Sequence, residues 1–136
     1  MAIVVGYVPT REGRAALRHA AHECELRTSR LVVINSNRGG KTYDADEAAR
    51  LETELRQVQE RLEAAGLEHE VRHLVRGNEA AEDLLEVAEA VDAELIVIGL
   101  RRRTPVGKLI LGSNAQRILL DASCPVFAVK AGPDEE

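Results

Sequence analysis

Aromatic residues are almost absent from this sequence, which has one phenylalanine, two tyrosines and no tryptophan among 136 residues. Stacking platforms for single-stranded nucleic acid depend on aromatic side chains, so the composition argues against that class of protein. Blocks of basic residues are also lacking, because the 18 lysines and arginines run together only at Arg101–Arg103, and 23 acidic residues give a formal net charge of -5. An acidic chain of this kind is a poor candidate for sequence-independent DNA binding.

Cysteine and long apolar runs are equally scarce. Cys24 and Cys124 are far apart and follow no metal-ligand spacing, so they are expected to be reduced thiols in the core. No apolar run approaches the ~20 residues that a membrane-spanning helix needs. The pattern of a signal peptide is also missing. These absences predict a soluble, cytoplasmic protein whose core consists of valine, leucine, isoleucine and alanine.

Five short segments have the composition of β-strands. Three are nearly continuous apolar runs, typical of strands that are buried on both faces, and they cover residues 2–8, 31–34 and 94–99. A further apolar segment, residues 125–130, is the predicted last strand. Residues 68–75 instead alternate polar and apolar side chains, which predicts a half-exposed edge strand. Four further segments have apolar residues at helical spacing, and each is a predicted helix. The first begins after Thr10, the second covers about residues 44–65, the third begins after Asn78, and the fourth covers residues 113 to about 120. Thr10 and Asn78 are predicted N-caps, and Gly66 is placed to end the second helix.

Alternating strands and helices predict an α/β fold of the doubly wound, Rossmann-like type. We expect a five-stranded parallel sheet in the order 3-2-1-4-5, with helices on both faces. Residues 1–130 form the predicted domain, and residues 131–136 form a polar tail.

Ligands of such sheets bind beyond the carboxyl ends of the strands, where the winding direction reverses. Tyr7, Val8 and Pro9 are expected to line that crevice on one side, and the loop after Gly99 on the other. The loop ends at Gly112-Ser113-Asn114, where free amides at a helix start favour phosphate. Arg101 and Arg102 add positive charge. The alternatives are that this glycine and serine simply cap the helix and that the arginines are solvated.

The loop carries a resemblance to a known family. Residues 99–113 read GLRRRTPVGKLILGS, which resembles the motif of the universal stress protein family: glycine, two residues, glycine, nine residues, then glycine with serine or threonine. Gly99 and Gly112-Ser113 match the outer positions of that motif. The segments IVVG, AALRHA, RGN and ASCPVFAV resemble other parts of the family's domain.

The resemblance implies a regulatory protein, usually dimeric, that holds ATP or a related adenine nucleotide (ADP, AMP or cyclic AMP), with or without Mg²⁺. Carried over by position, Gly99, Gly112, Ser113 and Asn114 would contact phosphates and ribose. Ser36, at the end of the second strand, would lie beside the adenine. The predicted site residues are therefore Tyr7, Val8, Pro9, Ser36, Ile98, Gly99, Arg101, Arg102, Gly112, Ser113 and Asn114.

Two positions depart from the family pattern. Arg102 replaces the motif's second glycine, so its guanidinium would replace a close backbone approach to phosphate. Val8 replaces the aspartate near the end of the first strand that contacts the nucleotide in the family. These departures leave open a second interpretation, in which the chain binds no nucleotide and acts through protein contacts.

The sequence indicates no catalytic residues. Residues 100–114 contain no aspartate or glutamate that could hold Mg²⁺ for ATP hydrolysis, although slow hydrolysis stays open as an alternative. His19 and His22 could share a helix face, but no third ligand accompanies them, so no metal site is predicted. The last strand is apolar at Val126, Phe127, Ala128 and Val129, and an edge of that kind predicts a homodimer through this strand.

Overall fold

The computed structural model describes residues 1–40, 43–101 and 111–131. The strands in these residues are β1 (Ala2–Gly6), β2 (Arg30–Ser36), β3 (His69–Leu74), β4 (Ala93–Leu100) and β5 (Val126–Lys130). The helices are α1 (Arg11–Arg27), α2 (Ala45–Ala64), α3 (Ala80–Ala90) and α4 (Ser113–Asp121). The predicted elements are all present, and most of their ends differ from the prediction by a few residues.

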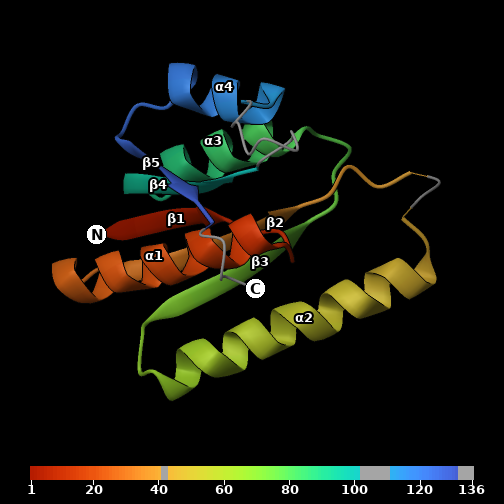
Figure 1. Cartoon of the computed structure of the whole chain (residues 1–136), viewed down its shortest axis with the longest axis horizontal. Helices are drawn as coiled ribbons and strands as arrows, with labels where there is room; N and C mark the ends of the chain where they lie inside the picture. Colours follow the sequence, from red (N-terminus) through yellow and green to blue (C-terminus); the bar gives the residue numbers. More distant parts are fainter. Residues whose placement is uncertain (41–42, 102–110, 132–136) are drawn as a thin grey trace.

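All strands run parallel in a single sheet with the order β3-β2-β1-β4-β5, which confirms the predicted topology (Figure 1). β1 is central, because Val4 pairs with Val32 on one side and with Ile96 on the other. The chain winds outward from β1 through β2 to β3, and then crosses back to β4. The winding direction therefore reverses between β1 and β4, as the sequence predicted.

Helices cover both faces of the sheet, and each face has its own apolar cluster (Figure 1). Val5 and Val33 pack with residues of α1 and α2, such as Ala16 and Leu55. Val4 packs on the opposite face with residues of α3 and α4. Because side chains of a strand alternate between faces, neighbouring residues of one strand contribute to different clusters.

The helix ends confirm two of the three predicted caps. The Thr10 side chain accepts a hydrogen bond from the Gly13 amide at 3.1 Å. Gly66 follows α2 with φ of +70°, a left-handed conformation that glycine adopts without a Cβ clash. The prediction for Asn78 was wrong, because the N-cap of α3 is Glu79. Asn78 instead donates a side-chain hydrogen bond to Asp83 at 3.1 Å.

The two edges of the sheet differ in their side chains. β3 is half-exposed along its length, as predicted. On β5, Phe127 is 39% exposed and Ala128 is exposed, whereas Val129 is buried in the core. Only part of the predicted apolar edge therefore presents its side chains to solvent.

Burial removes Cys24 from reactive chemistry. Its side chain is 1% exposed in the α1–α2 cluster, and burial raises the pKa of its thiol to about 12. Cys124 packs partly buried against the other cluster. Both positions agree with the structural role that the sequence predicted.

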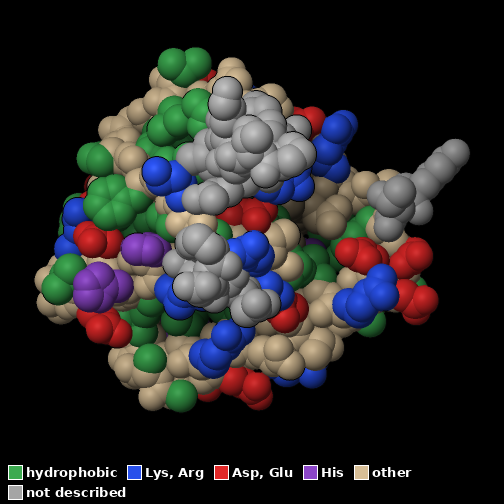
Figure 2. Space-filling model, viewed as in Figure 1, with side chains coloured by type: hydrophobic (Ala, Val, Ile, Leu, Met, Phe, Trp, Pro, Cys, Tyr) green, Lys and Arg blue, Asp and Glu red, His purple; other side chains and the backbone are tan. Residues whose placement is uncertain are grey.

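The surface is mixed in charge. In Figure 2, acidic and basic side chains of the described residues are interspersed over the visible face. Among the described residues, no helix is both long and apolar enough to span a bilayer.

Candidate functional site

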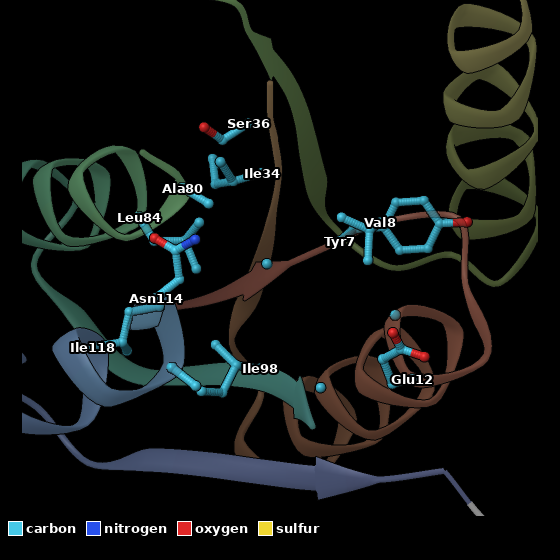
Figure 3. A pocket seen from close by; sticks show the side chains of 14 residues that line it. Tyr7, Val8, Glu12, Ile34, Ser36, Ala80, Leu84, Ile98, Asn114 and Ile118 are labelled. Atoms are coloured by element: carbon cyan, nitrogen blue, oxygen red, sulfur yellow. The ribbon is translucent and has the colours of Figure 1, made fainter. Parts of the chain in front are cut away.

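A cavity of about 190 Å³ opens at the carboxyl ends of β1, β2 and β4, between the first turns of α1, α3 and α4 (Figure 3). It lies at the reversal point of the winding, which is where the topology predicted a ligand site. The lining consists of Gly6, Tyr7, Val8, Glu12, Gly13, Ile34, Ser36, Ala80, Leu84, Ile98, Gly99, Asn114, Ala115 and Ile118.

The structure brings together part of the predicted site. The predicted residues that line this cavity are Tyr7, Val8, Ser36, Ile98, Gly99 and Asn114. Pro9 borders a neighbouring cavity of about 330 Å³ on the α2 side, which shares Val8 and Ser36 with the first. Arg101 is exposed, and Gly112 and Ser113 form the start of α4 without lining the cavity. Arg102 lies outside the described residues.

Tyr7 lines the cavity without directing its ring into it. Figure 3 shows the ring pointing away from the cavity toward α2. The Tyr7 hydroxyl donates a hydrogen bond to Glu54 Oε1 at 2.7 Å. Burial, and then the neighbouring Glu54 carboxylate, raise the pKa of this phenol well above its usual range. The Tyr7 side chain therefore belongs to the contact between the sheet and α2.

Glycines bring α1 close to the sheet beside the cavity. A Cβ on Gly99 would lie 2.7 Å from the Glu12 carbonyl carbon, and closer still to its oxygen. A Cβ on Gly13 would lie 2.9 Å from the Val8 carbonyl carbon and would overlap its oxygen. These contacts are with backbone atoms, which cannot rotate away. Gly99 therefore has a packing role in addition to any contact with a ligand.

Ser36 is tied to a buried carboxylate behind the cavity wall. Its hydroxyl donates to Asp83 Oδ2 at 2.5 Å, and the Asp83 side chain is fully buried. Asp83 Oδ1 also accepts hydrogen bonds from Arg76 at 2.6 Å and from Asn78 at 3.1 Å. The hydroxyl proton of Ser36 is therefore occupied, and its oxygen is left to act as an acceptor.

The start of α4 forms another part of the site. Asn114 Oδ1 accepts a hydrogen bond from the Ala81 amide at 3.0 Å, so this side chain joins α4 to the first turn of α3. No described side chain caps α4 itself, whose N-cap is Gly112. Thr10 and Asp44, by contrast, cap α1 and α2. The first amides of α4 are therefore donors without a described side-chain partner.

Several lining residues were missed by sequence analysis. Ala80 and Leu84 come from α3, which the sequence placed only as a covering helix. Glu12 brings a carboxylate from the first turn of α1 to the opposite side of the cavity from Ser36 and Asn114 (Figure 3). A usable signal existed for Glu12, because the first turn of a helix that follows a strand lies at the crevice.

Comparison with known proteins identifies the family. A family model described as the universal stress protein family matches residues 1–130. The chain belongs to this family.

Individual relatives agree with that assignment. A universal stress protein of Mycolicibacterium smegmatis is 46% identical over 128 residues, covering 94% of this chain and 96% of its own. A universal stress protein structure from Archaeoglobus fulgidus has a TM-score of 0.82 at 37% identity, covering 96% of this chain and 98% of its own. A second structure from that organism, in complex with dAMP, has a TM-score of 0.77 at 32% identity with the same coverage. The family resemblance drawn from the glycine motif is therefore confirmed.

Metal binding finds little support in this geometry. Within residues 1–40, 43–101 and 111–131, no group of three histidine, cysteine, aspartate or glutamate side chains is placed to hold an ion. His19 and His22 are exposed on α1. Glu12 is the one carboxylate among the described residues of the cavity lining.

Proposed function

We propose that the chain binds an adenine nucleotide in the cavity at the carboxyl ends of β1, β2 and β4, and acts as a regulatory ligand-binding protein. The observation that carries this proposal is the position of the start of α4, which no described side chain caps, beside an apolar cavity. Asn114 and Ala115, in the first turn of this helix, line the cavity. Helix N-termini attract anions through free amides and the helix dipole, so this end suits a phosphate.

The rest of the cavity suits a purine base. Ile34, Leu84 and Ile98 supply an apolar wall for a flat ring. Ser36 presents an acceptor, because its proton is donated to Asp83. The 6-amino group of adenine can donate a hydrogen bond to the Ser36 oxygen. The 6-oxo group of guanine only accepts hydrogen bonds, so it would face the Ser36 oxygen as a second acceptor. We therefore expect adenine to be preferred to guanine.

The family supports the same ligand class. The Archaeoglobus fulgidus protein in complex with dAMP is similar over 96% of this chain. An adenine mononucleotide is the simplest ligand consistent with that complex.

Binding without efficient catalysis is the activity that this site supports best. Phosphate hydrolysis needs a held metal ion and a group that orients the attacking water. Glu12 alone supplies a carboxylate among the described lining residues, which is too few for a Mg²⁺ site that relies on protein ligands. Mg²⁺ is therefore not part of the proposal. A cytoplasmic location stays a prediction from the sequence.

Isothermal titration calorimetry with AMP, cyclic AMP, ATP and GMP tests the proposal. Ala80 lines the cavity at the first position of α3, whereas Ala90 is exposed at the last position of the same helix. Ala80→Leu should weaken AMP binding by about ten-fold or more, because the larger side chain occupies volume that the ligand needs. Ala90→Leu, the matched control, should bind as the wild type does.

The proposal fails if none of these nucleotides binds to wild-type protein and none is released when the purified protein is denatured. If Ala80→Leu and Ala90→Leu lost the same affinity for AMP, the effect would not be specific to the cavity, and the ligand would bind elsewhere. Turnover of added ATP with Mg²⁺ would instead favour the hydrolytic alternative.

The proposal also includes a homodimer through β5. This strand is an edge of the sheet, and Ala128 lies exposed at its middle. Antiparallel pairing about a two-fold axis would cover both copies of the edge and bring the two Ala128 residues close together.

Ala128→Lys should therefore yield monomers, because two lysines would face each other across the axis. His73→Lys is the matched control, since His73 is exposed on β3 at the opposite edge. Light scattering on the eluate of a sizing column gives the mass of each variant. A dimer that persists in Ala128→Lys, or dissociates in His73→Lys, would show that the contact does not use β5.

A further inference from the structure

Glu12 is the lining residue whose chemistry the proposed function leaves unexplained. Its side chain is half-buried and lies in the first turn of α1 at the edge of the cavity (Figure 3). The other polar side chains directed at the cavity already have partners, because Ser36 donates to Asp83 and Asn114 accepts from Ala81. No hydrogen bond or ion pair to the Glu12 carboxylate is found in the described part of the chain.

The backbone holds Glu12 in place. Its carbonyl packs directly on Gly99, where the absence of a Cβ allows the first turn of α1 to approach the end of β4. Thr10 caps the same turn through the Gly13 amide. The backbone and Cβ of Glu12, from which its carboxylate extends, are therefore positioned beside Gly99 by the capped first turn of α1 rather than by a loop.

The chemistry of a carboxylate limits what it can bind here. An ionised carboxylate only accepts hydrogen bonds, so its partner must be a cation or a donor. A divalent cation would need further oxygen ligands, and the described lining supplies no second carboxylate. A phosphate would be repelled. Two vicinal hydroxyl groups, in contrast, match the two oxygens of one carboxylate.

We infer that Glu12 accepts hydrogen bonds from the two ribose hydroxyls of the nucleotide and makes the site selective for nucleotides that carry both hydroxyls over nucleotides that lack them. This inference rests on the proposed function. It assigns to Glu12 the carboxylate contact with the nucleotide that the family pattern would place at residue 8, where this chain has valine. Val8 lies in the connection between β1 and α1, and Glu12 lies four residues further along the chain, in the first turn of α1.

A structural role for Glu12 predicts a different result. An acidic residue in the first turn of a helix stabilises the helix through its dipole, and this effect does not depend on the sugar of a ligand. The preference for ribose over deoxyribose is therefore the measurement that separates the two roles.

The experiment measures the affinities of AMP and 2′,3′-dideoxy-AMP by calorimetry in wild type, Glu12→Ala and Glu25→Ala. Glu25 is the matched control, because it is an exposed glutamate near the other end of α1. We expect wild type and Glu25→Ala to bind AMP roughly 10- to 100-fold more tightly than the dideoxy compound, the range for a charged hydrogen bond. In Glu12→Ala that ratio should fall to about one, chiefly through weaker AMP binding.

Each other outcome overturns the inference. If AMP binds to wild type and the ratio is the same in Glu12→Ala, Glu12 does not contact the sugar, while the proposed function stands. If Glu12→Ala loses affinity equally for both compounds, the residue acts on the fold or on another part of the ligand. If wild type binds neither compound, the proposed function fails and this inference fails with it.

Discussion

Gly99→Ala is expected to lower the free energy of unfolding by about 3 kcal/mol, although alanine is intrinsically better than glycine within a strand. The new Cβ would lie 2.7 Å from the Glu12 carbonyl carbon and 3.1 Å from the Glu12 Cβ. Relief requires α1 to move away from β4, which disturbs the cluster that contains Ala16 and Val97. Urea unfolding followed by circular dichroism measures the loss.

Gly6→Ala provides a matched comparison. Gly6 ends β1 next to the end of β4, and its added Cβ would meet Leu84 Cδ2 at 2.8 Å. The end of a leucine side chain can rotate, whereas a helix backbone cannot, so we expect a loss of only about 1 kcal/mol. If the two variants were equally stable, the close approach of α1 to Gly99 would not be a feature of the folded protein.

This result bears on how the glycine motif is interpreted. By resemblance, Gly99 is a residue that contacts phosphate or ribose. The structure shows that a side chain at this position would first collide with the backbone of α1. The glycine therefore fixes the wall of the cavity before any ligand enters. Loss of nucleotide binding in a Gly99 variant would not by itself identify a direct contact.

The architecture was predictable from the sequence because its signals are local and repeated. Four apolar runs separated by amphipathic segments specify a parallel sheet with helices on both faces. Because the winding direction reverses between β1 and β4, the position of the cavity follows from the topology. Residues 94–99, one of the predicted apolar runs, lie within β4, an interior strand between β1 and β5.

The details of the site were less predictable, because they depend on which face each side chain occupies. Tyr7 follows Val5 at a spacing of two residues, so its ring lies on the α1–α2 face and bonds to Glu54. That alternation was visible in the sequence, but the sequence does not say on which face the cavity opens. Asn78 illustrates another limit of sequence-based prediction, because its role depends on a contact made in the folded chain. Glu79 caps α3, and the Asn78 side chain donates a hydrogen bond to Asp83 instead.

Asp83 was not recognised at all from the sequence, where it is one of several acidic residues at the start of a helix. Its significance arises only when β2, the turn after β3 and α3 come together. Ser36, Arg76 and Asn78 then direct donors at one fully buried carboxylate. A contact between residues 36 and 83 has no local signal in the sequence.

Asp83→Ala should lower the free energy of unfolding by about 3 kcal/mol at pH 7, because the Ser36, Asn78 and Arg76 donors lose their common acceptor. Glu86→Ala is the matched control on the same helix. Glu86 is exposed and, among the residues that the structure describes, pairs only with Arg76, at 3.3 Å, so its loss should cost less than about 0.5 kcal/mol. Equal effects of the two substitutions in urea unfolding would contradict the central role of Asp83.

The contribution of Asp83 should also depend on pH in a defined direction. Burial alone would raise the pKa of its carboxyl group, but hydrogen bonds from Ser36, Asn78 and Arg76 outweigh burial and hold the pKa below its ordinary value. The unfolded chain, with an aspartate pKa of about 3.9, therefore binds a proton more readily than the folded chain. The stability that Asp83 supplies is complete above about pH 5 and is lost as the pH falls through the folded pKa.

The stability gap between wild type and Asp83→Ala should stay constant from about pH 8 to pH 5 and narrow below about pH 4, because protonation removes the charge that the three donors stabilise. A gap that stays unchanged down to about pH 2 would mean that the network depends on the shape of the side chain and not on its charge.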